Sequence, residues 1–235
     1  MTNTSIQKYL AGFVHIYTAM GSVIAFVMIL TALKGDTTGF LWLTLIAMVI
    51  DGTDGFLARK FDVKKNIPWF DGATLDNIVD YLTYVFAPVV LLWTNNYLPQ
   101  NTAGLIIVSA VLLSSCYQFC RSDAKTDNKN YYFLGFPDYW NIIAFYAIVA
   151  GLSPNTTLLI LLVCAILVFV PIKFLYPSRT KQYQKITVPL TILWFIAFLV
   201  IMMQLPNPNQ GLVQLSLIYP IYYFLASIYL TLQIK

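Results

Sequence analysis

The chain has 235 residues, of which only 10% are charged and 59% are apolar, and its mean hydropathy is +0.71. Soluble domains carry about 25% charged residues, so the composition excludes an ordinary water-soluble domain. A formal net charge of +4 gives no strongly basic surface for nucleic acid. Several apolar runs reach the roughly 20 residues that cross a bilayer core. We therefore predict an all-α integral membrane protein that forms a single membrane domain over residues 1–235.

Eight segments are predicted to cross the membrane as a bundle of helices. In chain order they cover residues 9–33, 38–57, 73–93, 102–120, 139–150, 156–174, 186–204 and 212–232. The fifth segment is short, so we expect it to begin earlier or to contain a break. The polar N-terminal stretch MTNTSIQKYL and the length of the first apolar run are unlike a cleaved signal peptide.

Positive charge is divided very unevenly between the two sides that these helices define. Only Lys34 falls on one side. The other side, which holds both termini, has thirteen cations: Lys8, Arg59, Lys60, Lys64, Lys65, Arg121, Lys125, Lys129, Lys173, Arg179, Lys181, Lys185 and Lys235. Because short loops rich in Lys and Arg stay in the cytoplasm, we predict that both termini are cytoplasmic.

Acidic residues are concentrated in one stretch, residues 51–80. The chain has no glutamate, and six of its ten aspartates lie in this stretch. Asp51 and Asp54 are three residues apart and Asp76 and Asp80 are four apart, so each pair shares one face of a helix. An ionisable side chain at or inside the end of a membrane helix is costly and indicates a functional site.

Four carboxylates that face one another need a counter-charge to stay ionised. Hard divalent cations take oxygen ligands and usually bind through a few carboxylates together with substrate phosphates. Two such ions a few ångströms apart form an arrangement used for phosphoryl transfer. We therefore predict two Mn²⁺ or Mg²⁺ ions, held by Asp51, Asp54, Asp76 and Asp80. Solvated acids near the membrane surface are the alternative, but they leave the doubled helical spacing unexplained.

The same stretch resembles the signature of the CDP-alcohol phosphotransferases, Asp-x2-Asp-Gly-x2-Ala-Arg followed by Gly-x3-Asp-x3-Asp. The matching positions are Asp51, Asp54, Gly55, Ala58, Arg59, Gly72, Asp76 and Asp80. The spacer between the two halves, residues 60–71, is longer than in many members. The wider context, with FDGATLDNIVDYLTYVFAP, VHIYTAMG and FLGFPDYWN, resembles the bacterial phosphatidylcholine synthases.

This resemblance implies an enzyme that transfers the phosphatidyl group of CDP-diacylglycerol to choline and releases CMP. Asp76 and Asp80 would be catalytic, with Asp80 as the base for the choline hydroxyl. CDP and its phosphates would be bound by Gly55, Ala58, Arg59 and Gly72. The resemblance also implies a homodimer in the bacterial inner membrane, with its site facing the cytoplasm and membrane lipid around it. No serine, cysteine or histidine nucleophile lies beside a base, which favours direct attack over a covalent intermediate.

Choline recognition is expected to use aromatic side chains, because a quaternary ammonium is attracted to aromatic faces. Tyr84 lies one turn beyond Asp80 on the same helix face. Tyr139, Trp140 and Asn141 begin the fifth helix, and the only histidine, His15, lies in the first. The aromatic segment 131–141 also has the composition of an interfacial belt. A lone histidine such as His15 is more often a hydrogen-bonded core residue.

Three alternative functions account for the sequence features to different extents. The same chemistry could use serine, glycerol phosphate or inositol as acceptor, although the aromatic segment favours choline. A divalent-cation transporter would place its acids near the bilayer midplane in broken helices, whereas these acids lie at helix ends beside Arg59. A purely structural membrane protein leaves the acidic cluster unexplained.

Overall fold

A computed structural model describes residues 3–124, 131–177 and 179–233 of the chain. Within these residues, six helical segments are long and apolar enough to cross a membrane: Ile6–Leu33, Thr37–Lys60, Gly72–Thr94, Thr102–Cys120, Gln184–Met203 and Gln210–Gln233. The prediction of a helical, multi-pass membrane protein is therefore confirmed. Three of the thirteen cations that carry the orientation prediction, Lys125, Lys129 and Lys235, lie outside the described residues.

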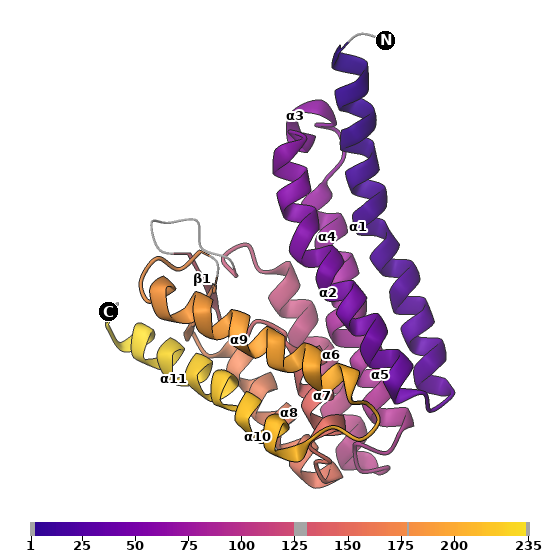
Figure 1. The fold of residues 1–235 in the computed structure, drawn as a ribbon, viewed down its shortest axis with the longest axis vertical. Helices are drawn as coiled ribbons and strands as arrows, with labels where there is room; N and C mark the ends of the chain where they lie inside the picture. The colour runs from indigo at the N-terminus through magenta and orange to yellow at the C-terminus, as the bar shows by residue number, and fades with distance from the viewer. Residues whose placement is uncertain (1–2, 125–130, 178, 234–235) are drawn as a thin grey trace. The chain divides into compact units, whose positions relative to one another are not determined.

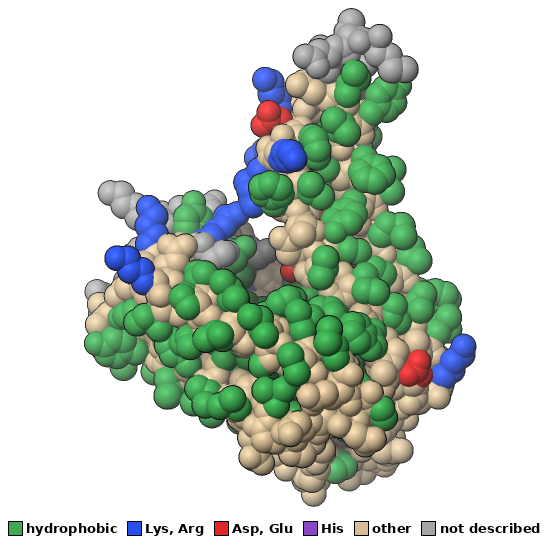
Figure 2. Space-filling view, viewed as in Figure 1, with side chains coloured by type: hydrophobic (Ala, Val, Ile, Leu, Met, Phe, Trp, Pro, Cys, Tyr) green, Lys and Arg blue, Asp and Glu red, His purple; other side chains and the backbone are tan. Residues whose placement is uncertain are grey.

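The chain divides into two compact units, Met1–Asn95 and Asn96–Lys235. Unit 1 contains α1 (Asn3–Leu33), α2 (Thr37–Lys60), α3 (Val63–Asn66), α4 (Gly72–Asp80), the π-helix η1 (Tyr81–Phe86) and α5 (Ala87–Thr94). Within it, α1 packs along α2 and also against α4, η1 and α5 (Figure 1). Large apolar side chains project outward from α1, including Phe13, Ile16 and Phe26, as contact with lipid requires (Figure 2).

Asp71 starts the helix that carries two of the predicted site aspartates. Its carboxylate accepts hydrogen bonds from the backbone N–H groups of Ala73 (3.0 Å) and Thr74 (3.1 Å) and from the Thr74 hydroxyl (2.7 Å). These bonds satisfy donors that the first turn of a helix leaves unpaired. The Thr74 hydroxyl, followed by the backbone bonds, lowers the pKa of Asp71 below its ordinary value of 3.8.

The cap at Asp71 predicts a pH-dependent contribution to stability. Because the pKa is lower in the folded state, the contribution is complete above the unfolded value near 3.8 and is lost as the pH falls through the lowered folded value. Asp71→Asn keeps a capping oxygen but cannot titrate. Thermal unfolding of both proteins, measured from neutral to strongly acid pH, should show the wild-type advantage shrinking at the acid end. A difference in Tm that stays constant with pH would contradict this role.

Unit 2 contains α6 (Thr102–Cys120), α7 (Trp140–Val149), α8 (Pro154–Phe169), α9 (Gln184–Met203), α10 (Gln210–Ser216) and α11 (Ile218–Gln233), with two short strands, β1 (Tyr132–Leu134) and β2 (Lys173–Leu175). The strands pair antiparallel, with Phe133 opposite Phe174. The backbone N–H groups of Lys173 and Leu175 donate to Thr231 and Ser227 of α11, at 2.7 and 3.1 Å. Hydroxyl groups of α11 thus accept hydrogen bonds from the backbone N–H groups of β2 that its one partner strand, β1, does not pair.

Two details of the fold prediction change in unit 2. The predicted end of the sixth helix at residue 174 is wrong, because α8 ends at Phe169 and residues 173–175 form β2. Pro171 follows the C-cap residue Val170 and cannot donate the backbone hydrogen bond that a continuing helix needs. The β1–β2 ribbon also means that the chain is mostly, not entirely, α-helical. The fifth and sixth predicted spans correspond to helices of only 10 and 16 residues.

The backbone conformation at position 135, in the turn that follows β1, requires glycine. Gly135 has a φ of +84°, and a Cβ added there would overlap the carbonyl oxygen of Val168. Its N–H donates to the carbonyl of Ile172 at 2.9 Å, which holds the turn against the end of α8. We expect Gly135→Ala to lower the Tm by several degrees, since both the backbone angle and the contact oppose a side chain. Gly12→Ala is the matched control, because an added Cβ there would make only an ordinary contact at 3.7 Å. This variant should leave the Tm unchanged.

Candidate metal and substrate site

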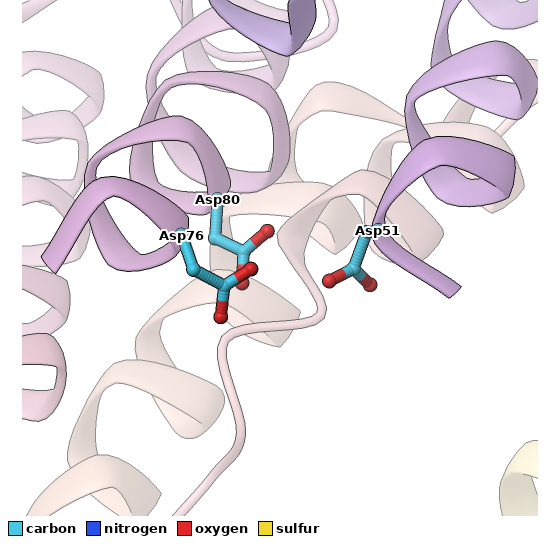
Figure 3. A group of neighbouring side chains, drawn as sticks. All are labelled: Asp51, Asp76 and Asp80. Atoms are coloured by element: carbon cyan, nitrogen blue, oxygen red, sulfur yellow. The ribbon is translucent and has the colours of Figure 1, made fainter. Parts of the chain in front are cut away.

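Three aspartates from two helices of unit 1 converge (Figure 3). Asp51 belongs to α2, and Asp76 and Asp80 belong to α4. One carboxylate oxygen from each lies within 4.8 Å of the other two. Ligand oxygens on opposite sides of a Mg²⁺ ion are about 4.2 Å apart, so small side-chain rotations let this trio surround one hard cation. The donors are all carboxylate oxygens, which fits the Mg²⁺ or Mn²⁺ that the sequence predicts.

Asp54 takes a different position from the other three. It lies outside the trio among the described residues, it is 7% exposed, and its Oδ2 accepts a hydrogen bond from the Thr18 hydroxyl at 2.9 Å. This contact ties α2 to α1 one turn beyond Asp51. The assignment of Asp54 as a metal ligand stays a prediction, and the sequence analysis missed the role of Thr18. The Thr18 hydroxyl, three residues after His15 in an apolar helix, was the available signal.

Tyr84 lies at the aspartates, as its spacing from Asp80 predicts. Its hydroxyl donates to Oδ2 of Asp51 at 2.8 Å, which links η1 to α2. This position is confirmed, whereas contact with choline stays a prediction. The bond can fix the orientation of one carboxylate of the trio, and such outer-shell partners tune metal ligands.

The helix that presents Tyr84 changes its hydrogen-bond register directly after Asp80. Residues 81–86 form a π-helix, in which the N–H of Ala87 donates to the carbonyl of Leu82, five residues back. Pro88, at the start of α5, has no N–H with which to continue the α-helical pattern. Short π-helical segments inside α-helices often occur at functional sites.

Removing the Tyr84 hydroxyl tests whether the residue acts through Asp51. Outer-shell substitutions cost about tenfold to a hundredfold in metal affinity. We expect Tyr84→Phe to raise the Mn²⁺ concentration needed for half-maximal activity by about tenfold, which is the low end of that range. The choline KM should not change. Tyr9→Phe, at an exposed position on α1, is the control. A selective rise in the choline KM would instead place Tyr84 in the acceptor site.

His15 packs beside the start of α4. Its ring centroid lies 4.3 Å from that of Phe70, and a Cβ added at Gly72 would lie 2.9 Å from His15 Cε1. The buried Nε2 of His15 has no hydrogen-bond partner among the described residues. Contact of His15 with choline stays a prediction. The packing of His15 does supply a steric reason for glycine at position 72.

The other predicted phosphate residues separate into two groups. Ala58 packs against a small buried core formed by Ala11, Val14 and Val63, and its contact with CDP stays a prediction. Arg59 is exposed, and its Nη1 would lie 3.4 Å from a Cβ added at Gly55. The guanidinium and the glycine are thus adjacent on one face of α2, where contact with a phosphate stays a prediction.

The remaining predicted acceptor residues belong to unit 2. Trp140 is fully buried, and its indole N–H donates to Asp138 and to the Ser115 hydroxyl, each at 2.8 Å. Asn141 is also buried, and its side-chain oxygen accepts from the N–H of Ile142. Tyr139 is half-buried, with its ring centroid 6.0 Å from that of Tyr223.

Asp138 is a residue that the sequence analysis passed over. It is 3% exposed, and its Oδ1 accepts from the Ser115 hydroxyl at 2.6 Å as well as from Trp140. Burial raises the pKa of Asp138 to about 6, although the two hydrogen bonds act in the opposite direction. Its signal in the sequence was an acid inside the aromatic run YYFLGFPDYWN.

Apolar helices around a carboxylate trio suited to a hard cation fit one class of protein, the membrane transferases that act on phosphorylated substrates. The model of one family in that class, CDP-alcohol phosphatidyltransferase, matches residues 11–222. The chain belongs to the CDP-alcohol phosphatidyltransferase family, as the signature predicts.

Several proteins that are similar to this chain over most of its length are phosphatidylcholine synthases. The chain is 41% identical to the phosphatidylcholine synthase of Borreliella burgdorferi, with 98% of each chain covered. It is 39% identical to that of Pseudomonas aeruginosa, over 88% of this chain and 85% of the relative. It is 36% identical to that of Legionella pneumophila, over 96% and 90%. The resemblance to bacterial phosphatidylcholine synthases is therefore confirmed along nearly the whole chain.

Proposed function

We propose that this membrane enzyme transfers the phosphatidyl group of CDP-diacylglycerol to choline and releases CMP. The observation that carries the proposal is the convergence of Asp51, Asp76 and Asp80 on one point. Proteins of the same family that are similar over nearly the whole chain are phosphatidylcholine synthases, which supports choline as the acceptor. The apolar helices keep the lipid donor in the bilayer while the acceptor arrives from water.

The proposed reaction is a direct displacement at phosphorus. The choline hydroxyl oxygen forms a bond to the phosphorus that carries diacylglycerol, and the bond from that phosphorus to the oxygen of CMP breaks. Asp80, which is 8% exposed and lies in the trio, accepts the hydroxyl proton. Asp51 and Asp76, with Asp54 as a predicted third ligand and Asp80 shared, would hold Mn²⁺ or Mg²⁺, as one ion or two. When bound, the metal neutralises charge on the pyrophosphate oxygens.

Arg59 is proposed to bind a donor phosphate. Its guanidinium is exposed and lies over Gly55, with Nη1 3.4 Å from the position that a Cβ would take there. A planar guanidinium forms two parallel charge-assisted hydrogen bonds to phosphate oxygens. Gly72 would contribute by letting the chain pass close to the same ligand.

We also propose that all eight helical segments cross the bacterial inner membrane, with both termini and the aspartates on the cytoplasmic side. Thirteen cations against one support this orientation. Arg59, Lys60, Lys64 and Lys65 all follow the aspartates of α2 closely in the chain. A homodimer is proposed from the family resemblance, and cross-linking in native membranes tests it.

Purified protein tests the proposed function when it is given CDP-diacylglycerol, Mn²⁺ or Mg²⁺, and labelled choline, serine, inositol and glycerol phosphate separately. The expected result is labelled phosphatidylcholine, with one CMP released for each lipid formed. Asp76→Asn is the control for activity from contaminants. A different labelled lipid would identify another alcohol as the acceptor. Uptake of Mn²⁺ into sealed vesicles without any lipid product would favour the alternative of a divalent-cation transporter.

A further inference from the structure

A groove of about 520 Å³ lies between the start of α9 and one face of α11, entirely within unit 2 (Figure 1). Its lining includes Tyr183 and Ile186 at the start of α9 and Ile218, Tyr222, Ala226 and Tyr229 of α11. We propose that this groove binds an acyl chain of an anionic phospholipid that the enzyme does not consume, and that Lys181 and Lys185 contact the head-group phosphate. The proposal goes beyond the proposed function, because it concerns a second lipid and can be tested without turnover.

The groove is apolar and is not covered by the rest of the described chain. Ile186, Ile218 and Tyr229 line it, and each of these side chains is more than half exposed. The volume falls within the range of about 300–1,000 Å³ that is usual for pockets that bind small ligands. Beside helices that cross a bilayer, a concave surface of this kind is suited to hydrocarbon.

The length of the groove agrees with a lipid that occupies one leaflet. Its lining extends along α11 from Ile218 to Tyr229, which at 1.5 Å per residue is about 16 Å. Half of a hydrocarbon layer of about 30 Å is about 15 Å. An acyl chain that lies along α11 in one leaflet therefore matches the groove.

Hydrogen bonds between the two helices give the groove fixed walls. The hydroxyl groups of Thr187 and Tyr222 lie 2.8 Å apart, as do those of Thr191 and Tyr219. Because the Tyr222 hydroxyl is used in this way, its ring presents an apolar wall to the groove. Ala226, four residues further along the same face of α11, adds only a methyl group and leaves the space open.

A cluster of polar side chains joins the start of α9 to the end of α11. Oε1 of Gln233 accepts hydrogen bonds from the Gln182 amide and from the Tyr183 hydroxyl, each at 2.8 Å. The exposed side chains of Lys181 and Lys185 are adjacent in the chain to this cluster. Among the described residues, no carboxylate forms an ion pair with either lysine. This is therefore the end of the groove where a charged head group would lie.

The charge of this part of the chain favours an anionic lipid. Residues 139–235 contain five Lys or Arg residues and no acid. Lys173 and Arg179 lie over tyrosine rings, at 5.5 and 5.4 Å from the ring centroids, whereas no such contact involves the described Lys181 or Lys185 side chains. Cations near the membrane surface attract anionic lipids and not zwitterionic ones. Phosphatidylglycerol is therefore expected to bind and phosphatidylethanolamine is not.

The first test measures this selectivity and its dependence on the two lysines. Full-length protein in detergent is titrated with phosphatidylglycerol or phosphatidylethanolamine of identical acyl chains, and bound lipid is counted by native mass spectrometry. We expect one phosphatidylglycerol per protomer, bound in preference to phosphatidylethanolamine. The double variant Lys181→Gln with Lys185→Gln should raise the Kd about thirtyfold, since each surface cation contributes about fivefold. Lys8→Gln with Lys34→Gln removes two exposed cations of unit 1 and is the control, with an unchanged Kd.

The second test fills the groove. Ala226→Phe places a ring where the acyl chain would lie, so it should abolish the binding of phosphatidylglycerol. Ala103→Phe, at an exposed position on α6, is the matched control and should not change that binding. If Ala226→Phe does not fold, the lysine variant still tests the proposal, because it alters only exposed side chains. Equal binding of the two lipids by the wild type, or unchanged binding in folded Ala226→Phe, would overturn the proposal.

Two other occupants of the groove would be recognised by the same measurements. The residues proposed to bind the donor, including Arg59, belong to unit 1, which is why the proposal names a lipid that is not consumed. Tighter binding of CDP-diacylglycerol than of phosphatidylglycerol, lost in Ala226→Phe, would assign the groove to the donor. A changed oligomeric state in that variant would assign it to an interface between copies, and either result overturns the proposal. Failure of the proposed function appears instead as absence of phosphatidylcholine synthesis and leaves these binding results unaffected.

Discussion

Replacing Asp51 or Asp76 by asparagine is expected to reduce transfer by about a thousandfold, the effect of about 4 kcal/mol of lost transition-state stabilisation. Each carboxylate belongs to the trio whose oxygens lie within 4.8 Å of one another. A neutral amide holds a hard dication poorly, so the loss should appear in metal binding as well as in turnover. Product formation and the stabilisation of the protein against heat by Mn²⁺ are the two measurements.

The same variants should be at least as stable as the wild type when metal is removed by a chelator. Without a cation the three carboxylates repel one another, and asparagine removes part of that repulsion. Asp62→Asn, at an exposed position in the spacer after α2, is the matched control and should retain both turnover and the Mn²⁺ effect. Near-normal turnover in Asp51→Asn or Asp76→Asn would show that the trio does not hold the essential metal.

Gly72→Ala is expected to lower turnover by about tenfold to a hundredfold, because misplacing catalytic groups by about 1 Å has an effect of that size. An added Cβ would lie 2.9 Å from His15 Cε1, so either the imidazole ring, which packs on Phe70, or the start of α4 must shift. Since α4 carries Asp76 and Asp80, its displacement moves two members of the trio. Steady-state kinetics, together with thermal unfolding to show that the variant is folded, measures the effect.

A double-mutant cycle shows whether the effect arises from that contact. His15→Ala makes room for the new methyl group, so the double variant should recover much of the turnover lost in Gly72→Ala. Gly12→Ala, on the same helix as His15, provides the control for adding a methyl group to α1. If the double variant is as defective as Gly72→Ala, the glycine is needed for another reason, such as close contact with the donor.

Much of unit 1 could be predicted from the sequence because the deciding signals are local. Hydropathy locates the long helices, and the four-residue spacing of Asp76 and Asp80 identifies two acids on one helix face. The same spacing placed Tyr84 near the trio. The match to a family signature added the chemistry, since spacing alone does not tell phosphate from another ligand. The helix predicted at residues 102–120 matches α6 residue for residue.

Other contacts could not be predicted because they join positions far apart in the chain. Thr18 and Asp54 are 36 residues apart, and their hydrogen bond depends on how α1 packs on α2. The contact between His15 and Gly72 depends on how α1 packs on α4. No periodicity reports either pairing. Asp54 therefore looked equivalent to Asp51, although one is held by a threonine and the other by a tyrosine.

Two features of the chain were visible in the sequence but were not used. Pro171 stands three residues before the predicted end of the sixth helix, and proline seldom continues a helix. Asp138 is the only acid in the aromatic segment. Its place in the core of unit 2 emerges only when Ser115, 23 residues earlier, is found against it. A three-residue strand such as β1 is too short for a hydropathy pattern to identify.

Under the proposed function, the position of Asp51 along α2 fixes the depth at which the chemistry takes place. With 1.5 Å per residue, Asp51 lies about 21 Å from the start of the helix at Thr37. A hydrocarbon layer is about 30 Å thick, so a helix that enters it near Thr37 presents the carboxylates below the opposite water surface. A donor must then lower its pyrophosphate past the level of the lipid head groups, which a molecule anchored by two acyl chains does far more readily than a free nucleotide. In a thinner bilayer the same carboxylates lie closer to bulk water, and water then competes with the alcohol for the activated phosphate. Bilayer thickness thus becomes a determinant of how faithfully the enzyme makes lipid instead of hydrolysing its donor.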